Sequence, residues 1–68
     1  MNEEIFNMEV RRFLKRFGIS AQREIEKAVR KGIETGDLSG SEAIKVRAKL
    51  EIEGLEEALL IEEDLHLF

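Results

Sequence analysis

The stretch IKVRAKLEIE, residues 44–53, decides the fold that the sequence predicts. Apolar and charged side chains alternate here without a break, beginning with Ile44 and Lys45. Because successive side chains of a strand point to opposite faces, this alternation predicts a half-buried β-strand over residues 43–53. The alternation resumes at Leu59 and is interrupted only at Glu63. We therefore expect a second strand over residues 59–67 and a hairpin turn at residues 54–57.

Charge predicts the register of this hairpin. A register in which paired residue numbers sum to 111 forms two pairs of opposite charge, Lys49 with Glu62 and Arg47 with Asp64. A sum of 113 would place Glu51 opposite Glu62, and like charges in that position destabilise a sheet. We therefore expect the register of 111, with Glu63 on the inner face opposite Ala48. The competing prediction makes residues 55–68 a third helix, but Glu62 interrupts the apolar face that such a helix would have.

Two helices are predicted before the strands, over residues 2–17 and 20–35. In the first, Asn2 is a suitable N-cap, and apolar residues recur at three- and four-residue steps: Phe6, Val10, Phe13, Leu14 and Phe17. Gly18 fits the left-handed residue that ends a helix. In the second, Ser20 is the N-cap, Gly36 is the stop, and the apolar positions carry mostly small side chains: Ala21, Ile25, Ala28, Val29, Gly32 and Ile33.

These elements predict an α+β fold in the order α-α-β-β, with two N-terminal helices packed on one face of a C-terminal antiparallel β-hairpin. The 68 residues form one small domain, residues 1–68. A core of this size seldom leaves more than about 3–5 kcal/mol of net stability, and a lone two-stranded sheet is marginal in water. Chain length alone therefore leaves self-association open as one way to complete the core.

Composition excludes several classes of protein. The net charge of −4 and a pI near 5.0 argue against a dedicated nucleic-acid binder, whose domains usually run basic. The chain has no Cys, so disulfides and thiolate zinc sites are excluded. We see neither a signal peptide nor an apolar run of membrane-spanning length, and we expect a cytoplasmic protein.

Charge is unevenly distributed along the chain. Residues 1–36 hold eight basic and six acidic side chains, whereas residues 37–68 hold three and nine. One interpretation is a pair of solvated faces that attract each other weakly. The other is a partner surface on the helices formed by Arg12, Lys15, Arg16, Arg23 and Lys27.

Other candidate sites are weaker. The Phe17–Ser20 segment resembles a helix-turn-helix corner, but Glu24 stands where that motif needs an apolar residue, and no third helix follows. The Phe-rich face of the first helix suits a membrane surface, but a small core needs the same residues.

Glu62, Asp64 and His66 share one strand face and could ligate a metal ion, although facing cations make an ion-pair ladder the simpler interpretation. His66 is the only His, and no nucleophile, base and orienter can be assembled around it.

The N-terminal sequence resembles a known family. The segments that carry the resemblance are Met1-Asn2-Glu3, Phe6-Asn7-Met8, Arg12-Phe13-Leu14-Lys15 with Gly18, and above all residues 22–30. They are similar to a family of short bacterial proteins known only as a domain of unknown function, mainly over residues 1–30. The resemblance implies a bacterial protein and brings no activity, cofactor or site residue with it.

The expected function is that of a small non-catalytic protein that acts through protein–protein contacts, with a homodimer as one form. The alternative is a weak nucleic-acid-binding module that uses the basic faces of the helices. We assign no catalytic, cofactor-binding or metal-binding residue and no small-molecule ligand, and the protein partner is either unknown or a second copy of the chain.

Overall fold

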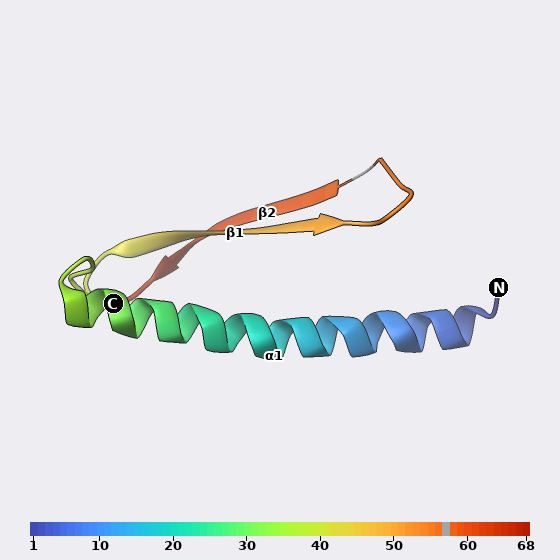
Figure 1. Cartoon of the computed structure of the whole chain (residues 1–68), viewed down its shortest axis with the longest axis horizontal. Helices are drawn as coiled ribbons and strands as arrows, with labels where there is room; N and C mark the ends of the chain where they lie inside the picture. Colours follow the sequence, from blue (N-terminus) through green and yellow to red (C-terminus); the bar gives the residue numbers. More distant parts are fainter. Residues whose placement is uncertain (57) are drawn as a thin grey trace. The chain divides into compact units, whose positions relative to one another are not determined.

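The structure, a computed structural model, describes residues 1–56 and 58–68 as far as the backbone is concerned. It divides into two compact units, residues 1–37 and residues 38–68, each of which is described by itself. The first unit is a single helix and the second is a β-hairpin (Figure 1). The α+β class and the C-terminal position of the hairpin are confirmed, whereas a single domain with the helical part packed on the hairpin stays a prediction.

Helix α1, Glu3–Thr35, is 33 residues long and has a well-defined cap at each end. At its start, the Ile5 N–H donates to the Asn2 side-chain oxygen at 3.1 Å, and Glu3 and Glu4 favour the positive end of the helix dipole. At its end, Gly36 adopts a left-handed φ of 82° and donates its N–H to the Ile33 carbonyl at 3.2 Å. The caps predicted at Asn2 and Gly36 are confirmed, whereas Gly18 and the predicted N-cap Ser20 lie inside the helix and cap nothing.

The prediction of two helices with a break at Gly18 is wrong. The helix continues through residues 17–20, and Gly18 is not among the glycines with a positive φ, so it terminates nothing. The physical reason lies in the apolar spacing, which passes from Leu14 and Phe17 to Ala21 and Ile25 in steps of three and four. A helix stop would shift this phase, but here the phase is kept. One interior glycine costs only about 1 kcal/mol relative to Ala, which does not end a helix of this length.

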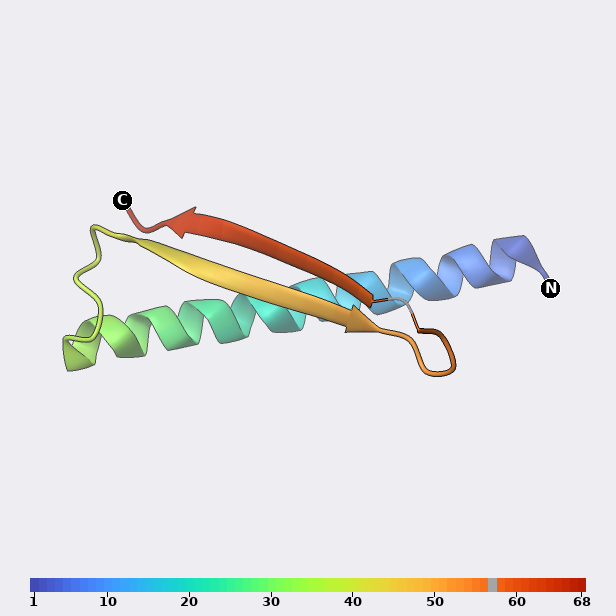
Figure 2. The same cartoon turned by 90° about the horizontal axis from the view of Figure 1, so that it is seen from above.

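Strands β1, Ala43–Glu51, and β2, Ala58–His66, form an antiparallel two-stranded sheet (Figure 2). Beyond the last ladder pair, the Leu67 N–H donates to the Glu42 carbonyl at 3.1 Å and extends the pairing at the base of the hairpin. The predicted strands are confirmed to within about two residues at their ends. The alternative of a C-terminal third helix is excluded by β2.

The predicted register is wrong by two residues. Ala43 faces His66, so paired residue numbers sum to 109 instead of 111, and Glu63 lies opposite Val46 instead of Ala48. Charge does not separate these two registers, because each supplies two pairs of opposite charge. In the observed register the charged pairs are Arg47 with Glu62 and Lys45 with Asp64.

The turn explains why the register is 109. The Leu55 N–H donates to the Ile52 carbonyl at 3.1 Å, which closes a four-residue turn immediately after β1. Its third residue, Gly54, has a φ of 83°, the left-handed value that a type II turn requires there. This turn removes Ile52 from the ladder and ends β1 at Glu51. The predicted turn at residues 54–57 therefore begins two residues earlier, and its last residue, Glu57, lies outside the described residues.

None of the side chains whose exposure the structure describes is buried. Large apolar residues of both units are about half-exposed, including Phe6, Phe13 and Phe17 of α1 and Leu59 and Ile61 of β2. Burial of such side chains is the main favourable contribution to folding. The apolar faces of the two units are therefore the first features to consider as functional surfaces.

Candidate functional surfaces

An apolar stripe runs along almost the whole of α1. We call it the α1 stripe, and its members are Phe6, Val10, Phe13, Phe17, Ala21, Ile25, Ala28 and Gly32. At about 100° per residue these eight positions fall within an arc of about 120°. The rings of Phe13 and Phe17 stack, with centroids 6.5 Å apart and planes inclined by 22°. Leu14 lies in the same arc and Val29 borders it.

Side-chain size changes along the α1 stripe. The N-terminal half, up to Phe17, carries three Phe residues, whereas the C-terminal half, from Ala21, carries two Ala residues and Gly32. Phe17 keeps 50% of its surface exposed, and Ala21, Ile25 and Gly32 are half-buried. The stripe therefore offers bulky side chains at one end and close backbone approach at the other.

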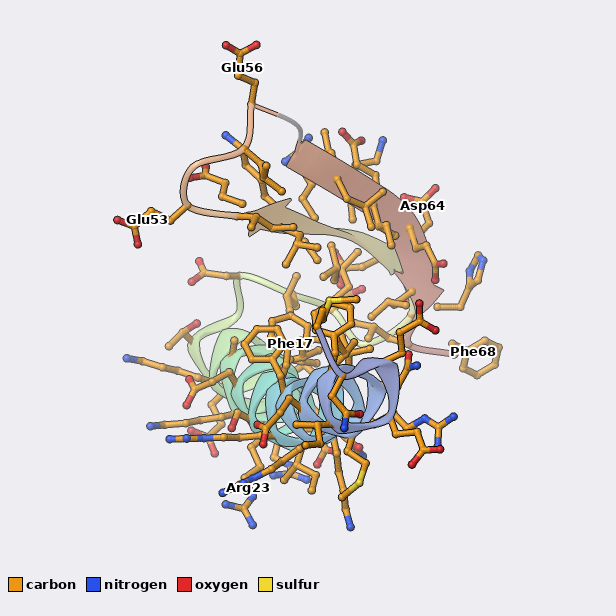
Figure 3. All side chains as sticks on the ribbon, turned by 90° about the vertical axis from the view of Figure 1, so that its right-hand side faces the viewer. Phe17, Arg23, Glu53, Glu56, Asp64 and Phe68 are labelled. Atoms are coloured by element: carbon orange, nitrogen blue, oxygen red, sulfur yellow. The ribbon has the colours of Figure 1, made fainter. Side chains whose placement is uncertain are left out.

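The continuous helix brings four of the five predicted partner-surface cations onto one face. These four, Arg12, Arg16, Arg23 and Lys27, fall within about 60° of one another and form what we call the basic face. Lys15 lies about 90° away from their centre. All five side chains are exposed. Phe17 and Arg23 project to different sides of α1 (Figure 3), so the α1 stripe and the basic face are separate surfaces.

The charges of the basic face have no partner within α1. Among the described side chains of the helix, the ion pair that forms is Arg30 with Glu26 at 3.3 Å, and Gln22 donates to the same carboxylate at 2.9 Å. Exposed pairs of this type contribute about 0.3–0.5 kcal/mol. The basic face is thus available to a ligand or a partner, although its role as a partner surface stays a prediction.

The charged face of the hairpin carries a short ladder of opposite charges. Arg47 approaches Glu62 across the strands at 3.7 Å, while Lys49 pairs along its own strand with Glu51 at 3.0 Å. The predicted contact of Lys49 with Glu62 does not form, because the register of 109 places Leu60 opposite Lys49. Beyond the strand ends, Glu53 and Glu56 point away from the sheet (Figure 3).

The metal cluster considered for β2 is not assembled. Glu62, Asp64 and His66 lie on one face of the strand, opposite Arg47, Lys45 and Ala43 respectively. No group of three or more metal-binding side chains comes together within the described residues. Arg47 and Lys45 lie opposite the two carboxylates in the register, and of these two facing pairs the one that forms an ion pair is Arg47 with Glu62.

The other face of the hairpin is apolar. Its members are Ile44, Val46, Ala48 and Leu50 from β1 with Leu59, Ile61 and Leu65 from β2. Glu63 is the charged residue on this face, and its side chain is exposed. The strand pairs Ile44 with Leu65 and Leu50 with Leu59. Such apolar cross-strand pairs each contribute about 0.2–1 kcal/mol to the sheet.

The loop before β1 contains a polar cluster that the sequence analysis missed. The Glu42 carboxylate accepts hydrogen bonds from the Ser39 hydroxyl at 3.0 Å, the Gly40 N–H at 3.2 Å and the Ser39 N–H. The Ser39 hydroxyl is also 3.1 Å from the Ser41 hydroxyl. The signal is a Ser three residues before a Glu, the spacing at which a carboxylate reaches back to a backbone N–H in a capping box.

This cluster organises the loop that leads into β1. The hydrogen bonds from the Ser39 backbone and hydroxyl, with a further one from the Gly40 backbone, hold the pKa of Glu42 below its ordinary value. What the cluster does is fix the chain path into β1.

The described surfaces of the chain are therefore amphipathic and charged. No helix in the described ranges combines the length and the apolar character that a membrane crossing requires. The model of a protein family described as "Family of unknown function (DUF6494)" matches residues 1–68, the whole chain and not only the first 30 residues. No curated protein matches the chain, and no solved structure does.

Proposed function

Since the chain belongs to this family of unknown function, DUF6494, whose description assigns no activity, we propose a function from the surfaces of the chain itself. We propose that it is a non-catalytic protein that acts through protein–protein contacts and that associates with a second copy of itself. The observation that carries the proposal is the α1 stripe. It extends from Phe6 to Gly32 and leaves large apolar side chains about half-exposed.

Apolar exposure on this scale favours association. Fully burying one large apolar side chain contributes about 1.5–3 kcal/mol, and the three Phe residues of the stripe each keep about half of that area exposed. Contiguous apolar patches of this kind mark interaction sites or aggregation-prone surfaces in soluble proteins. A helix that presents apolar residues at three- and four-residue steps is also the usual element of helix–helix recognition. The length and spacing of the stripe therefore support contact with another helix.

The experiment is sedimentation equilibrium of the full chain from micromolar to millimolar concentration. We expect a monomer–dimer equilibrium that Leu14→Glu shifts strongly toward monomer, because the new carboxylate lies within the apolar arc. Ile19→Glu is the matched control, since it introduces the same charge five residues further along, on the opposite side of α1. A strict monomer over the whole concentration range would refute self-association, and equal effects of the two variants would refute the role of the stripe.

A second proposal is weak nucleic-acid binding by the basic face. The observation that favours it is the single helix, which aligns Arg12 and Lys27 on one side about 22 Å apart along the axis. The net charge of −4 opposes it. Amide NMR titration with duplex DNA and single-stranded RNA at low salt separates the proposals, because phosphate contacts are strongest there. Shifts confined to the basic face would support binding, and unchanged α1 amides would exclude it.

A further inference from the structure

The spacing of the α1 stripe reads the same in both directions along the helix. From Phe6 to Gly32 the steps are four, three, four, four, four, three and four residues. This sequence of steps is a palindrome centred on residue 19. A second copy of α1 running in the opposite direction would therefore present its apolar side chains at the same levels along the shared axis.

The side chains at these levels complement one another in size. When two antiparallel copies are aligned so that facing residue numbers sum to 38, the layers are Phe6 with Gly32, Val10 with Ala28, Phe13 with Ile25, and Phe17 with Ala21. In three of these layers a larger side chain meets a small one, which keeps the filled volume similar along the interface. Parallel pairing would instead place Phe on Phe at one end and Gly on Gly at the other, so that one end would be crowded and the other hollow.

The charges beside the stripe favour the same alignment. Four charged residues, which we call the flank row, lie along one flank of α1 at about 55–110° from the local centre of the stripe: Glu9, Arg16, Glu24 and Lys31. Their signs alternate. In the alignment that sums to 38, Glu9 lies within two residues, about 3 Å along the axis, of the level of Lys31, and Arg16 lies equally near the level of Glu24. In antiparallel helix pairs the same flank of each helix faces itself, so every member of the row meets an opposite charge. None of the four forms an ion pair among the described residues.

The helix dipoles agree with this arrangement. Glu3 and Glu4 occupy the first turn of α1, and the last turn holds no basic residue to offset its partial negative charge. Antiparallel pairing sets the positive end of each dipole beside the negative end of the other, whereas parallel pairing sets like ends together.

From these three complementarities we propose that the occupant of the α1 stripe is a second copy of the chain, paired antiparallel about a twofold axis near residue 19. The proposal rests on the self-association proposed above and adds its geometry. Phe6 of each chain lies at the level of Gly32 of the other, and the two flank rows form four cross-chain contacts of opposite charge.

The first test measures the distance between two spin labels in the dimer by pulsed electron paramagnetic resonance. The chain contains no Cys, so a single introduced Cys carries each label without competing thiols. Met8→Cys and Ile19→Cys are suitable because both positions lie on the side of α1 away from the stripe. In the antiparallel dimer the residue 8 labels are separated along the axis by 22 residues, about 33 Å, whereas the residue 19 labels lie at one level.

The proposal expects a residue 8 distance that exceeds the residue 19 distance by more than 10 Å. Equal distances at the two positions would mean parallel pairing and would overturn the antiparallel proposal while leaving self-association intact. If the labelled and the unlabelled chains all sediment as monomers, the self-association proposal and the antiparallel proposal are both overturned. Helix content from circular dichroism, matched to that of the unmodified chain, establishes that each labelled variant is folded.

The second test exchanges charges in the flank row. Lys31→Glu places a carboxylate opposite Glu9 at two equivalent positions of the dimer, and we expect the dissociation constant to rise about fivefold or more. Adding Glu9→Lys restores opposite charges, so the double variant should return to within about twofold of the unmodified chain. A double variant that dimerises no better than Lys31→Glu alone would refute the proposed register.

Discussion

Phe17→Ala gives the most direct measurement of what the α1 stripe contributes to association. Phe17 keeps 50% of its surface exposed, and fully burying a Phe side chain contributes about 1.5–3 kcal/mol. Covering the remaining half is therefore worth about 1 kcal/mol per chain, or about 2 kcal/mol in a dimer that contains the residue twice. A difference of 2 kcal/mol corresponds to a rise of about 30-fold in the dissociation constant.

The assay is sedimentation equilibrium or dilution calorimetry at one ionic strength, with Ile19→Ala as the matched control. The exposed fraction of Ile19, 48%, is similar to that of Phe17, but Ile19 lies on the opposite side of α1. Ala has the highest helix propensity, so neither variant weakens the helix itself. The reasoning would be refuted if Phe17→Ala changed the dissociation constant by less than about threefold, or if Ile19→Ala raised it as much.

The remaining predictions concern the helix, the turn and the loop. Gly18→Ala should stabilise the chain by up to about 1 kcal/mol, because Gly18 is helical and an added Cβ meets nothing within 4 Å. The measurement is urea unfolding at fixed protein concentration. Destabilisation would indicate that Gly18 is a left-handed helix stop. Gly54→Ala should destabilise the hairpin by about 1 kcal/mol, because the φ of 83° is strained for any residue with a Cβ, and unchanged thermal unfolding would contradict the turn. In a carboxylate NMR titration the pKa of Glu42 should lie below its ordinary value, so its contribution to loop stability is complete above the unfolded pKa and is lost as the pH falls through the lowered one. Glu42→Gln should abolish the accompanying shifts of the Ser39 and Gly40 amides, and their persistence would count against these hydrogen bonds.

Local signals predicted the two ends of α1 and the presence of β1. Asn2 and Gly36 are read correctly from residue type alone, because capping depends on a few neighbouring atoms. The alternation of residues 44–53 likewise predicts β1, because the period of a strand is a property of the local backbone. The α+β class follows from these signals together.

Signals that compete with one another were less predictive. Gly18 followed by Ser20 has the composition of a stop and a new cap, and only the unbroken phase from Phe17 to Ala21 indicates that the helix continues. The register prediction was wrong for a different reason. Registers that sum to 109 and to 111 each form two pairs of opposite charge, and the turn geometry at Gly54 decides between them. Four of the five cations of the candidate partner surface share one face because the helix is continuous. The prediction of two separate helices could not place them on a common face.

The connectivity of each unit has a consequence for folding speed. Hydrogen bonds of α1 join residues four apart, and those of the hairpin join strands that follow each other directly in the chain. Chains dominated by such local contacts lose little entropy in closing loops, and helices and hairpins form in about 0.1–10 μs. If stable folding awaits the second chain, the observed rate will be set by bimolecular encounter. It will then increase with protein concentration, while the intramolecular steps are already complete.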